Sequence, residues 1–249
     1  SEASNTPVML MVRIRCCHVT GSYKTKDNIV PKLSVKEALA NPKRDFARVV
    51  LPPMSYAHEI DKVKNRWPAA EKFIVENKLN EIFGPTTSKI GIITQGGMYN
   101  GVIRALQRLG LADLNGNCKI PLYNLNVTYP LVKDEFLSFC ENKEAVIVVE
   151  EGQPEFIEQN LSSFLYRSKN SVALHGKDIF PRAGEYTGQV MLESLTSFIK
   201  MTLPDILPSQ IRSPNTTPTQ IPDLTETVPI RPPSFCTGCP ERPIFAAMK

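Results

Sequence analysis

The central part of the chain alternates between two patterns of apolar residues. Continuous apolar runs of strand length occur at residues 89–94, 119–125, 145–150 and 172–175. Around them, apolar residues recur every three or four positions, as on one face of a helix, over residues 67–83, 100–109, 133–140, 155–165 and 188–202. Strands that alternate with helices pair in parallel through right-handed crossovers. The pattern therefore predicts an α/β domain over residues 55–202, with an open, mostly parallel sheet and helices on both faces.

Proline and glycine mark the two ends of the first predicted helix. Pro68 suits its first turn, where the amide that proline lacks has no partner within the helix. Gly84 and Pro85 are typical of a helix end. We therefore expect this helix to span residues 67–83.

The flanks of the chain lack this alternation. Residues 8–15 (VMLMVRIR) predict a strand with no helix before it, and residues 21–54 carry the prolines and charges of a linker that runs over a surface. Residues 203–233 contain eight prolines and no apolar period, which predicts an extended connector. The domain boundaries therefore fall near residues 55 and 202.

Composition and charge exclude several classes of protein. With 42% hydrophobic and 22% charged residues among 249, the chain can bury a full core. Its net charge of +4 is small, and Lys and Arg are scattered among acids, so we expect no nucleic-acid partner. No apolar run reaches the roughly 18 residues that a membrane span needs. The six cysteines do not form a secreted disulfide framework, so we expect a cytoplasmic protein with reduced thiols and no membrane partner.

The sequence Cys236-Thr237-Gly238-Cys239-Pro240 predicts a tight turn that aims two thiolates at one point. Two such thiolates suit a soft metal or an iron-sulfur cluster, which needs four ligands in all. Two other interpretations remain: a turn whose cysteines only pack, and a redox dithiol. The dithiol is disfavoured because its motif normally ends a βα unit, whereas a Pro-rich stretch precedes this turn. We take Cys236 and Cys239 as candidate metal ligands.

Two further motifs follow predicted strands. Gly96, Gly97 and Gly101 open a helix and could hold an anion, although a tight connection between strand and helix needs the same glycines. Glu150 and Glu151 lie at the carboxyl end of a predicted strand, where open α/β sheets place ligands. Consecutive residues of a strand point to opposite sides, so the two glutamates are not a paired acid and base. We expect them to contact a neighbouring domain, and we name no catalytic residue.

Several stretches, taken in order, resemble the α-type subunit of the indolepyruvate ferredoxin oxidoreductases, which are thiamine-diphosphate-dependent 2-oxoacid:ferredoxin oxidoreductases. They are TPVMLMVRIRCCH (6–18), KIGIITQGGMYNGVIRAL (89–106), VIVVEEGQPEFIEQN (146–160), GKDIFPRAGEYT (176–187) and RPPSFCTGCPERP (231–243). The last motif is the most specific. It departs from the family at two positions: Thr237 stands where proline or serine is commoner, and Glu241 stands where histidine is usual. The resemblance implies an internal fragment of such an enzyme.

The resemblance also implies an order of domains. Residues 1–20 would end a pyrimidine-binding domain, and residues 21–54 would be a linker. Residues 55–202 would form a transketolase C-terminal-like domain, residues 203–233 a connector, and residues 234–249 the start of a thiamine-diphosphate-binding domain. The chain would then be mainly a structural and interface piece, inactive in isolation.

The activity that the resemblance implies is oxidative decarboxylation of an aryl 2-oxoacid, indolepyruvate, to an acyl-CoA with ferredoxin as electron acceptor. The cofactors would be thiamine diphosphate, Mg²⁺ and an iron-sulfur cluster in the full enzyme, none of them fully bound by this chain. Its partners would be the remaining domains or subunits of the same enzyme, ferredoxin, coenzyme A and the 2-oxoacid, in a dimer. Two alternatives are a related pyruvate-type oxidoreductase and a non-catalytic assembly or ligand-binding module.

Overall fold

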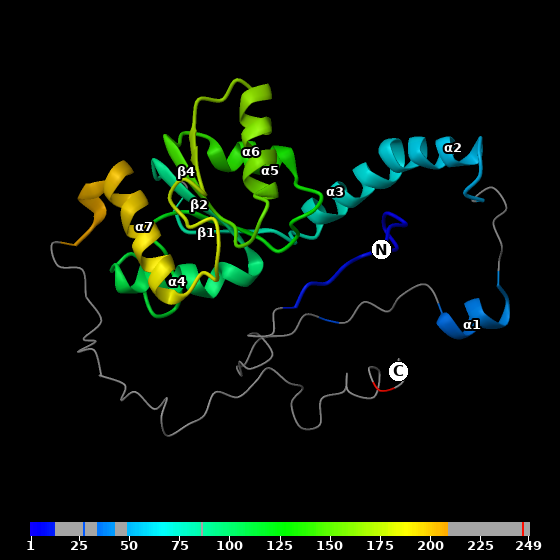
Figure 1. Ribbon diagram of the computed structural model, residues 1–249, viewed down its shortest axis with the longest axis horizontal. Coiled ribbons are helices and arrows are strands. Elements are labelled where there is room, and N and C mark those ends of the chain that lie inside the picture. Colours follow the sequence, from blue (N-terminus) through cyan, green and yellow to red (C-terminus); the bar gives the residue numbers. More distant parts are fainter. Residues whose placement is uncertain (13–26, 28–33, 43–48, 86, 209–245, 247–249) are drawn as a thin grey trace. The chain divides into compact units, whose positions relative to one another are not determined.

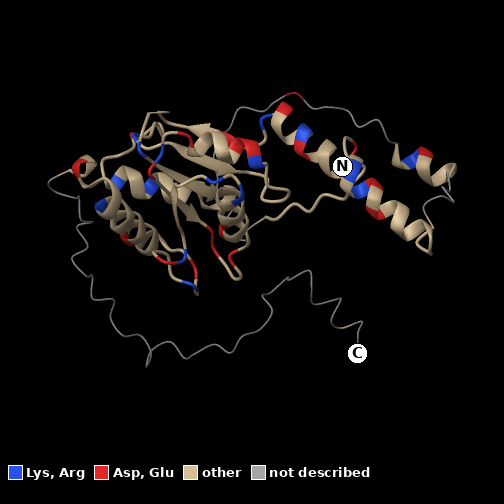
Figure 2. Cartoon of the chain, turned by 90° about the horizontal axis from the view of Figure 1, so that it is seen from above, with Lys and Arg blue, Asp and Glu red and all other residues tan. Residues whose placement is uncertain are grey.

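The computed structural model describes residues 1–12, 27, 34–42, 49–85, 87–208 and 246 (Figure 1). The chain divides into two units, Ser1–Arg212 and Ser213–Lys249, and every element described below belongs to the first. Charged residues of both signs alternate along the helices rather than gathering in one stripe (Figure 2). None of the helices in the described part combines the length and the hydropathy that a bilayer span requires.

The first unit contains seven α-helices and five strands among its described residues. The α-helices are α1 (Val35–Ala40), α2 (Met54–Asp61), α3 (Trp67–Glu76), α4 (Tyr99–Arg108), α5 (Lys133–Cys140), α6 (Phe156–Arg167) and α7 (Gly188–Thr202). The strands are β1 (Glu81–Phe83), β2 (Ile90–Gln95), β3 (Leu122–Leu125), β4 (Ala145–Val149) and β5 (Ala173–His175). Shorter turns are a π-helix, η3 (Lys62–Arg66), and two 3₁₀-helices, η4 (Gly96–Met98) and η5 (Pro204–Ile206).

The five strands form one sheet in the order β1-β3-β2-β4-β5. Strands β2, β3, β4 and β5 pair in parallel, and β1 joins β3 antiparallel at the edge. The prediction of an open, mostly parallel sheet is therefore confirmed. The chain enters the sheet at the edge strand β1, passes on to β2, and then adds β3 between these two strands. It next crosses to the other side of β2 to add β4 and then β5. The strand order thus reverses at β2, which makes the carboxyl ends of β2 and β4 a topological switch point.

Helices cover both faces of the sheet, as predicted (Figure 1). Ile92 pairs with Leu122 and Ile147 on the face where α4 and α7 form a core. Their neighbours Ile93, Tyr123 and Val148 point to the opposite face, toward α5 and α6. Because the side chains of a strand alternate between its two faces, a central strand in such a sheet must be apolar at every position. This burial on both faces explains the continuous apolar runs in the sequence.

The first predicted helix is longer at its start and shorter at its end than residues 67–83. It continues without a break from α2 through η3 into α3, and the N–H of Trp67 donates to the carbonyl of Lys62. Pro68, which cannot donate to the carbonyl four residues back, follows this wider turn directly. At the other end Lys78 adopts a left-handed φ of 48°, and the N–H of Leu79 donates to the carbonyl of Ile74. The helix prediction for residues 77–83 is therefore wrong.

The segment after that turn forms β1 instead, in which Ile82 pairs with Tyr123. Apolar side chains at positions 79, 82 and 83 keep a helical spacing. Three paired residues are too few for period two to stand out against it. The partner strand, about forty residues away along the chain, decides the structure.

The apolar segment at residues 8–12 does not form the predicted strand. Val8, Met9, Leu10, Met11 and Val12 have extended or irregular backbone and expose between 62% and 87% of their surface. A strand requires a neighbour for its N–H and carbonyl groups, and no described residue pairs with these five. The remainder of the predicted strand, residues 13–15, lies outside the described residues.

Two other flanking segments are partly described. The predicted linker contains α1, which begins where the Ser34 hydroxyl accepts from the N–H of Glu37. Residues 204–206 of the predicted connector form η5, and residues 209–233 lie outside the description. The domain boundaries stay predictions.

Gly91 in β2 gives a direct test of the packing between the sheet and α5. A Cβ at this position would lie 2.8 Å from two ring carbons of Phe139 and 3.1 Å from Lys143 Cδ. We expect Gly91→Ala to lower the free energy of unfolding by about 1–3 kcal/mol, because the extra methyl group overpacks a closed site. Urea denaturation measures this change. Gly188→Ala is the control: a Cβ there meets no atom within 4 Å, so its effect should be near zero or stabilising. Equal losses in both variants would contradict the packing described here.

Candidate functional site

The topological switch point gathers the polar residues that follow the central strands. Gln95 ends β2, and Glu150 and Glu151 follow β4 directly. Lys177 follows β5, and Tyr186 approaches from the segment before α7. This edge is where open α/β sheets bind ligands, so its hydrogen bonds decide whether a ligand can be held there.

Glu150 fills the amino end of α6. Its side chain is 5% exposed, and its carboxylate accepts the N–H of Ile157 at 2.9 and 3.1 Å and the N–H of Glu158 at 3.1 Å. Burial raises the pKa of Glu150, while these amides and Lys177 act in the opposite direction. An external phosphate or carboxylate would need the same donors. The chain's own carboxylate therefore takes the anion position of this helix.

Lys177 joins three segments at the same edge. Its Nζ donates to the carbonyl oxygen of Glu150 at 2.5 Å and to the Tyr186 hydroxyl at 2.7 Å, and it lies 4.8 Å from the centre of the Tyr186 ring. The hydroxyl in turn donates to the carbonyl of Pro181 at 3.0 Å. Burial lowers the pKa of Lys177 and raises that of Tyr186 to about 12. The lysine therefore acts as a clamp between β4 and the segment before α7.

Glu151 completes the connections across the switch point. Its N–H donates to Gln95 Oε1 at 3.1 Å, and its carboxylate accepts the N–H of Tyr186 at 2.7 Å. Both glutamates thus have hydrogen-bond partners within the chain. Their contact with a neighbouring domain stays a prediction, and the geometry gives each a role in closing this edge.

The glycines after β2 lie where close packing requires them. A Cβ on Gly96 would come within 2.9 Å of Asn126 Oδ1, and one on Gly101 would lie 3.4 Å from Met191 Cε on α7. These contacts account for the glycines as a tight connection between β2 and α4. The alternative interpretation of these glycines, an anion site, is therefore not needed to explain them.

A polar cluster that the sequence did not reveal, in which Tyr123 and Asn80 are buried, holds the loop after β3. The Tyr123 hydroxyl donates to Glu135 Oε2 at 2.8 Å, and Asn80 Oδ1 accepts the N–H of Val127 at 3.0 Å. The Asn126 amide donates to the carbonyl of Leu79 at 2.9 Å. Burial raises the pKa of Tyr123. The cluster ties this loop to the segment between α3 and β1.

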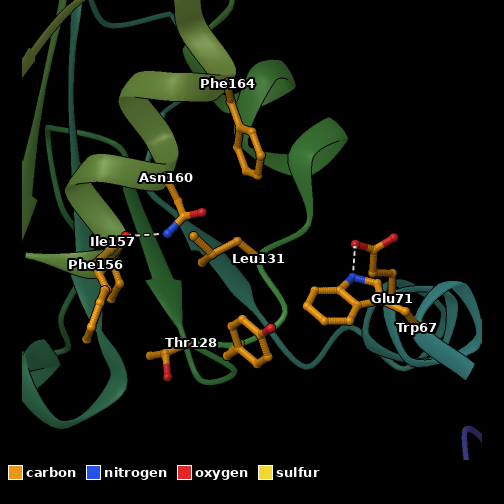
Figure 3. A pocket seen from close by; sticks show the side chains of 9 residues that line it. Trp67, Glu71, Thr128, Leu131, Phe156, Ile157, Asn160 and Phe164 are labelled. Atoms are coloured by element: carbon orange, nitrogen blue, oxygen red, sulfur yellow. Dashed lines mark hydrogen bonds between the residues drawn. The ribbon is translucent and has the colours of Figure 1, made fainter. Parts of the chain in front are cut away.

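The same loop forms one side of a pocket of about 240 Å³ (Figure 3). The pocket lies between α3, the loop after β3, and α6. It is lined by Trp67, Glu71, Thr128, Tyr129, Leu131, Phe156, Ile157, Asn160 and Phe164. The sequence placed Trp67 on an apolar helix face. It could not indicate the rings that face Trp67, because they come from distant parts of the chain.

The candidate metal ligands Cys236 and Cys239 lie outside the described residues. Cys118 and Cys140 are free and buried, and burial raises the pKa of both thiols, that of Cys140 to about 12. Such thiols behave as apolar packing residues. Among the described residues no group of three or more His, Cys, Asp or Glu side chains could hold a metal ion.

Comparisons with known proteins point to one family. A family profile described as "Indolepyruvate oxidoreductase domain" matches residues 80–224. The chain is 28% identical over 256 residues to indolepyruvate oxidoreductase subunit IorA of Pyrococcus abyssi and 26% identical over 252 residues to that of Methanothermobacter thermautotrophicus. Each match covers 100% of this chain and 36% of the relative, so the chain spans about a third of their length.

Two further matches are shorter. IorA of Thermococcus kodakarensis is 31% identical over 170 residues, which cover 68% of this chain and 24% of that protein. A solved structure of 2-oxoglutarate:ferredoxin oxidoreductase from Magnetococcus marinus, with 2-oxoglutarate, coenzyme A and succinyl-CoA bound, has a TM-score of 0.41 and 20% identity. It covers 59% of this chain and 24% of the other chain.

Removal of the Glu150 carboxylate tests its place at the amino end of α6. Glu150→Ala leaves the buried amides of Ile157 and Glu158 without an acceptor. We therefore expect the free energy of unfolding to fall by about 2 kcal/mol or more. Glu144→Ala is the matched control. It breaks an exposed ion pair in which Glu144 Oε1 lies 2.7 Å from Lys89 Nζ. We expect it to lower the free energy of unfolding by less than about 1 kcal/mol. A larger loss in the control, by urea denaturation, would contradict the capping role.

Proposed function

The chain belongs to the indolepyruvate oxidoreductase domain family, and from this premise we propose that it forms part of a 2-oxoacid:ferredoxin oxidoreductase acting on an aryl 2-oxoacid. In this reaction the bond between the carboxylate and the oxo carbon breaks and carbon dioxide leaves. The thiol of coenzyme A releases its proton to solvent, and its sulfur forms a thioester with the acyl carbon. Two electrons pass to ferredoxin. The family match over residues 80–224 is the observation that carries the proposal.

Within that enzyme the domain at residues 55–202 supplies structure and contact surface. The hydrogen bonds at the switch point support this role, because Glu150, Glu151 and Lys177 each have hydrogen-bond partners within the chain. A ligand would have to displace these bonds to enter. The surfaces of the domain would then contact the remaining domains or subunits of the enzyme.

The cofactors of the enzyme would be thiamine diphosphate, Mg²⁺ and an iron-sulfur cluster. Thiolates are the ligands that iron-sulfur clusters prefer, so the chemistry of Cys236 and Cys239 fits a cluster. When bound, the cluster would carry electrons toward ferredoxin. This chain would contribute the two thiolates and hold them close together through the glycine between them. The other two ligands would come from elsewhere in the enzyme.

An assay of the longer polypeptide with its partner subunits tests the proposed activity. With indolepyruvate, coenzyme A, thiamine diphosphate and Mg²⁺, we expect reduction of ferredoxin that depends on both coenzyme A and the 2-oxoacid. Pyruvate is the comparison substrate, and a preference for it would contradict the aryl specificity. Failure to reduce ferredoxin with any 2-oxoacid would support the non-catalytic module instead.

Single cysteine variants of the same longer protein test the cluster ligands. Cys236→Ser and Cys239→Ser should each lower the iron and sulfide content and slow the reduction of ferredoxin, because a serine oxygen is a poor ligand for iron in such a cluster. Cys118→Ser and Cys140→Ser are the controls, since these thiols are buried in the apolar core; they should alter stability and leave the cluster spectrum intact. Full iron content in Cys236→Ser and Cys239→Ser would show that other residues hold the cluster.

A further inference from the structure

Aromatic rings form much of the lining of the pocket between α3 and α6. Trp67 projects from α3, and Phe156 and Phe164 project from α6 (Figure 3). Tyr129, from the loop after β3, adds a fourth ring. Among the nine described residues that line the pocket, Glu71 alone is charged. The pocket therefore combines aromatic surfaces with a single negative charge.

The Trp67 ring lines the pocket with its hydrogen-bond donor already used. Its indole N–H donates to Glu71 Oε1 at 2.9 Å. The Tyr129 ring stands at 80° to the indole ring, with 5.0 Å between the two centroids. The indole donor is thus already satisfied, and its position keeps the carboxylate of Glu71 beside the aromatic walls (Figure 3).

The loop that carries Tyr129 is also fixed. Its backbone at Val127 bonds to the buried side chain of Asn80, and Asn126 bonds to the carbonyl of Leu79. These bonds tie the loop to the segment that follows α3. The two sides of the pocket are therefore connected before any ligand arrives, which lowers the ordering cost of binding.

Rings and carboxylate together favour a cation. The faces of aromatic rings carry negative potential and attract cations, and Glu71 adds a formal charge of the same sign. A neutral aromatic ligand would cover this carboxylate without compensating it. A guanidinium group is planar, stacks on aromatic rings, and sheds water more readily than an ammonium group. Among cations, it fits these walls best.

The rim of the pocket indicates where the cation comes from. Tyr129 and Phe156 are 72% and 62% exposed, so the rings remain largely open to solvent. Exposed aromatic rings around an open pocket are typical of surfaces that bind other proteins. We propose that this pocket docks an arginine side chain presented by another polypeptide, with its guanidinium stacked on the aromatic walls and paired with Glu71. The proposal is independent of the enzyme activity.

The single tryptophan of the chain allows a direct measurement. In the 249-residue chain labelled with 5-fluorotryptophan, one ¹⁹F resonance reports on the pocket wall. We expect a short arginine-containing peptide to shift this resonance, and to bind about tenfold more tightly than the same peptide with citrulline, the neutral isostere of arginine.

Four outcomes would overturn the proposal. One is equal binding of the arginine and citrulline peptides, and another is tighter binding of a phenylalanine peptide. The third is a resonance that none of the peptides moves at concentrations up to about 10 mM. Tighter binding of free guanidinium or tetramethylammonium than of the arginine peptide would identify a site for a small cation, and would likewise contradict docking of a polypeptide.

Variants of exposed or partly exposed residues separate the contribution of the Glu71 charge from that of the aromatic walls. Glu71→Gln should weaken binding of the arginine peptide about fivefold and leave binding of the citrulline peptide unchanged. Phe156→Ala should weaken both, because it removes a wall. Glu76→Gln is the matched control on the same helix, since Glu76 pairs with Lys72 on the surface, away from the pocket lining; it should change neither affinity. An equal effect of Glu71→Gln and Glu76→Gln would contradict the pairing with Glu71.

Discussion

The capping of α6 by the buried carboxylate of Glu150 is the interaction on which the carboxyl edge of the sheet depends. Burying a carboxylate costs free energy unless it is hydrogen-bonded. The carboxylate of Glu150, which is 5% exposed, accepts hydrogen bonds from the backbone N–H groups of Ile157 and Glu158. The cap fixes where the chain turns from β4 into α6. Lys177 can then reach the carbonyl of the same glutamate and the hydroxyl of Tyr186. Glu150 thus connects the end of β4 to the start of α6 through its carboxylate and, through its carbonyl and Lys177, to the segment before α7.

The hydrogen bonds around Glu150 and Lys177 occupy the edge of the sheet at which such folds usually bind a ligand. Open α/β sheets bind ligands at the switch point, but here the polar groups at that point bond to one another. The pocket that we propose as a docking site lies elsewhere, beside α3. The proposed role of the domain, to provide structure and contact surface in an enzyme, rests on the hydrogen bonds at the switch point.

The sequence was most informative where one face of an element is buried. The bounds of α5 and α7 match the predicted ranges 133–140 and 188–202, because their apolar residues follow the helical period without interruption. Strand β1 was missed because its partner, β3, lies far along the chain. The closure of the switch point and the aromatic pocket were missed for the same reason. Both depend on which side chains the tertiary structure brings together. The candidate metal ligands Cys236 and Cys239 lie outside the described residues, so their prediction is not tested.

A structure of the longer oxidoreductase with its 2-oxoacid and coenzyme A bound would test the central claim directly, namely that this domain provides surfaces and not a ligand site. We predict that the crevice at the carboxyl ends of β2 and β4 is free of substrate and cofactor, with Lys177 still bonded to Glu150 and Tyr186. A substrate or cofactor in contact with Gln95, Glu151 and Lys177 would contradict the account.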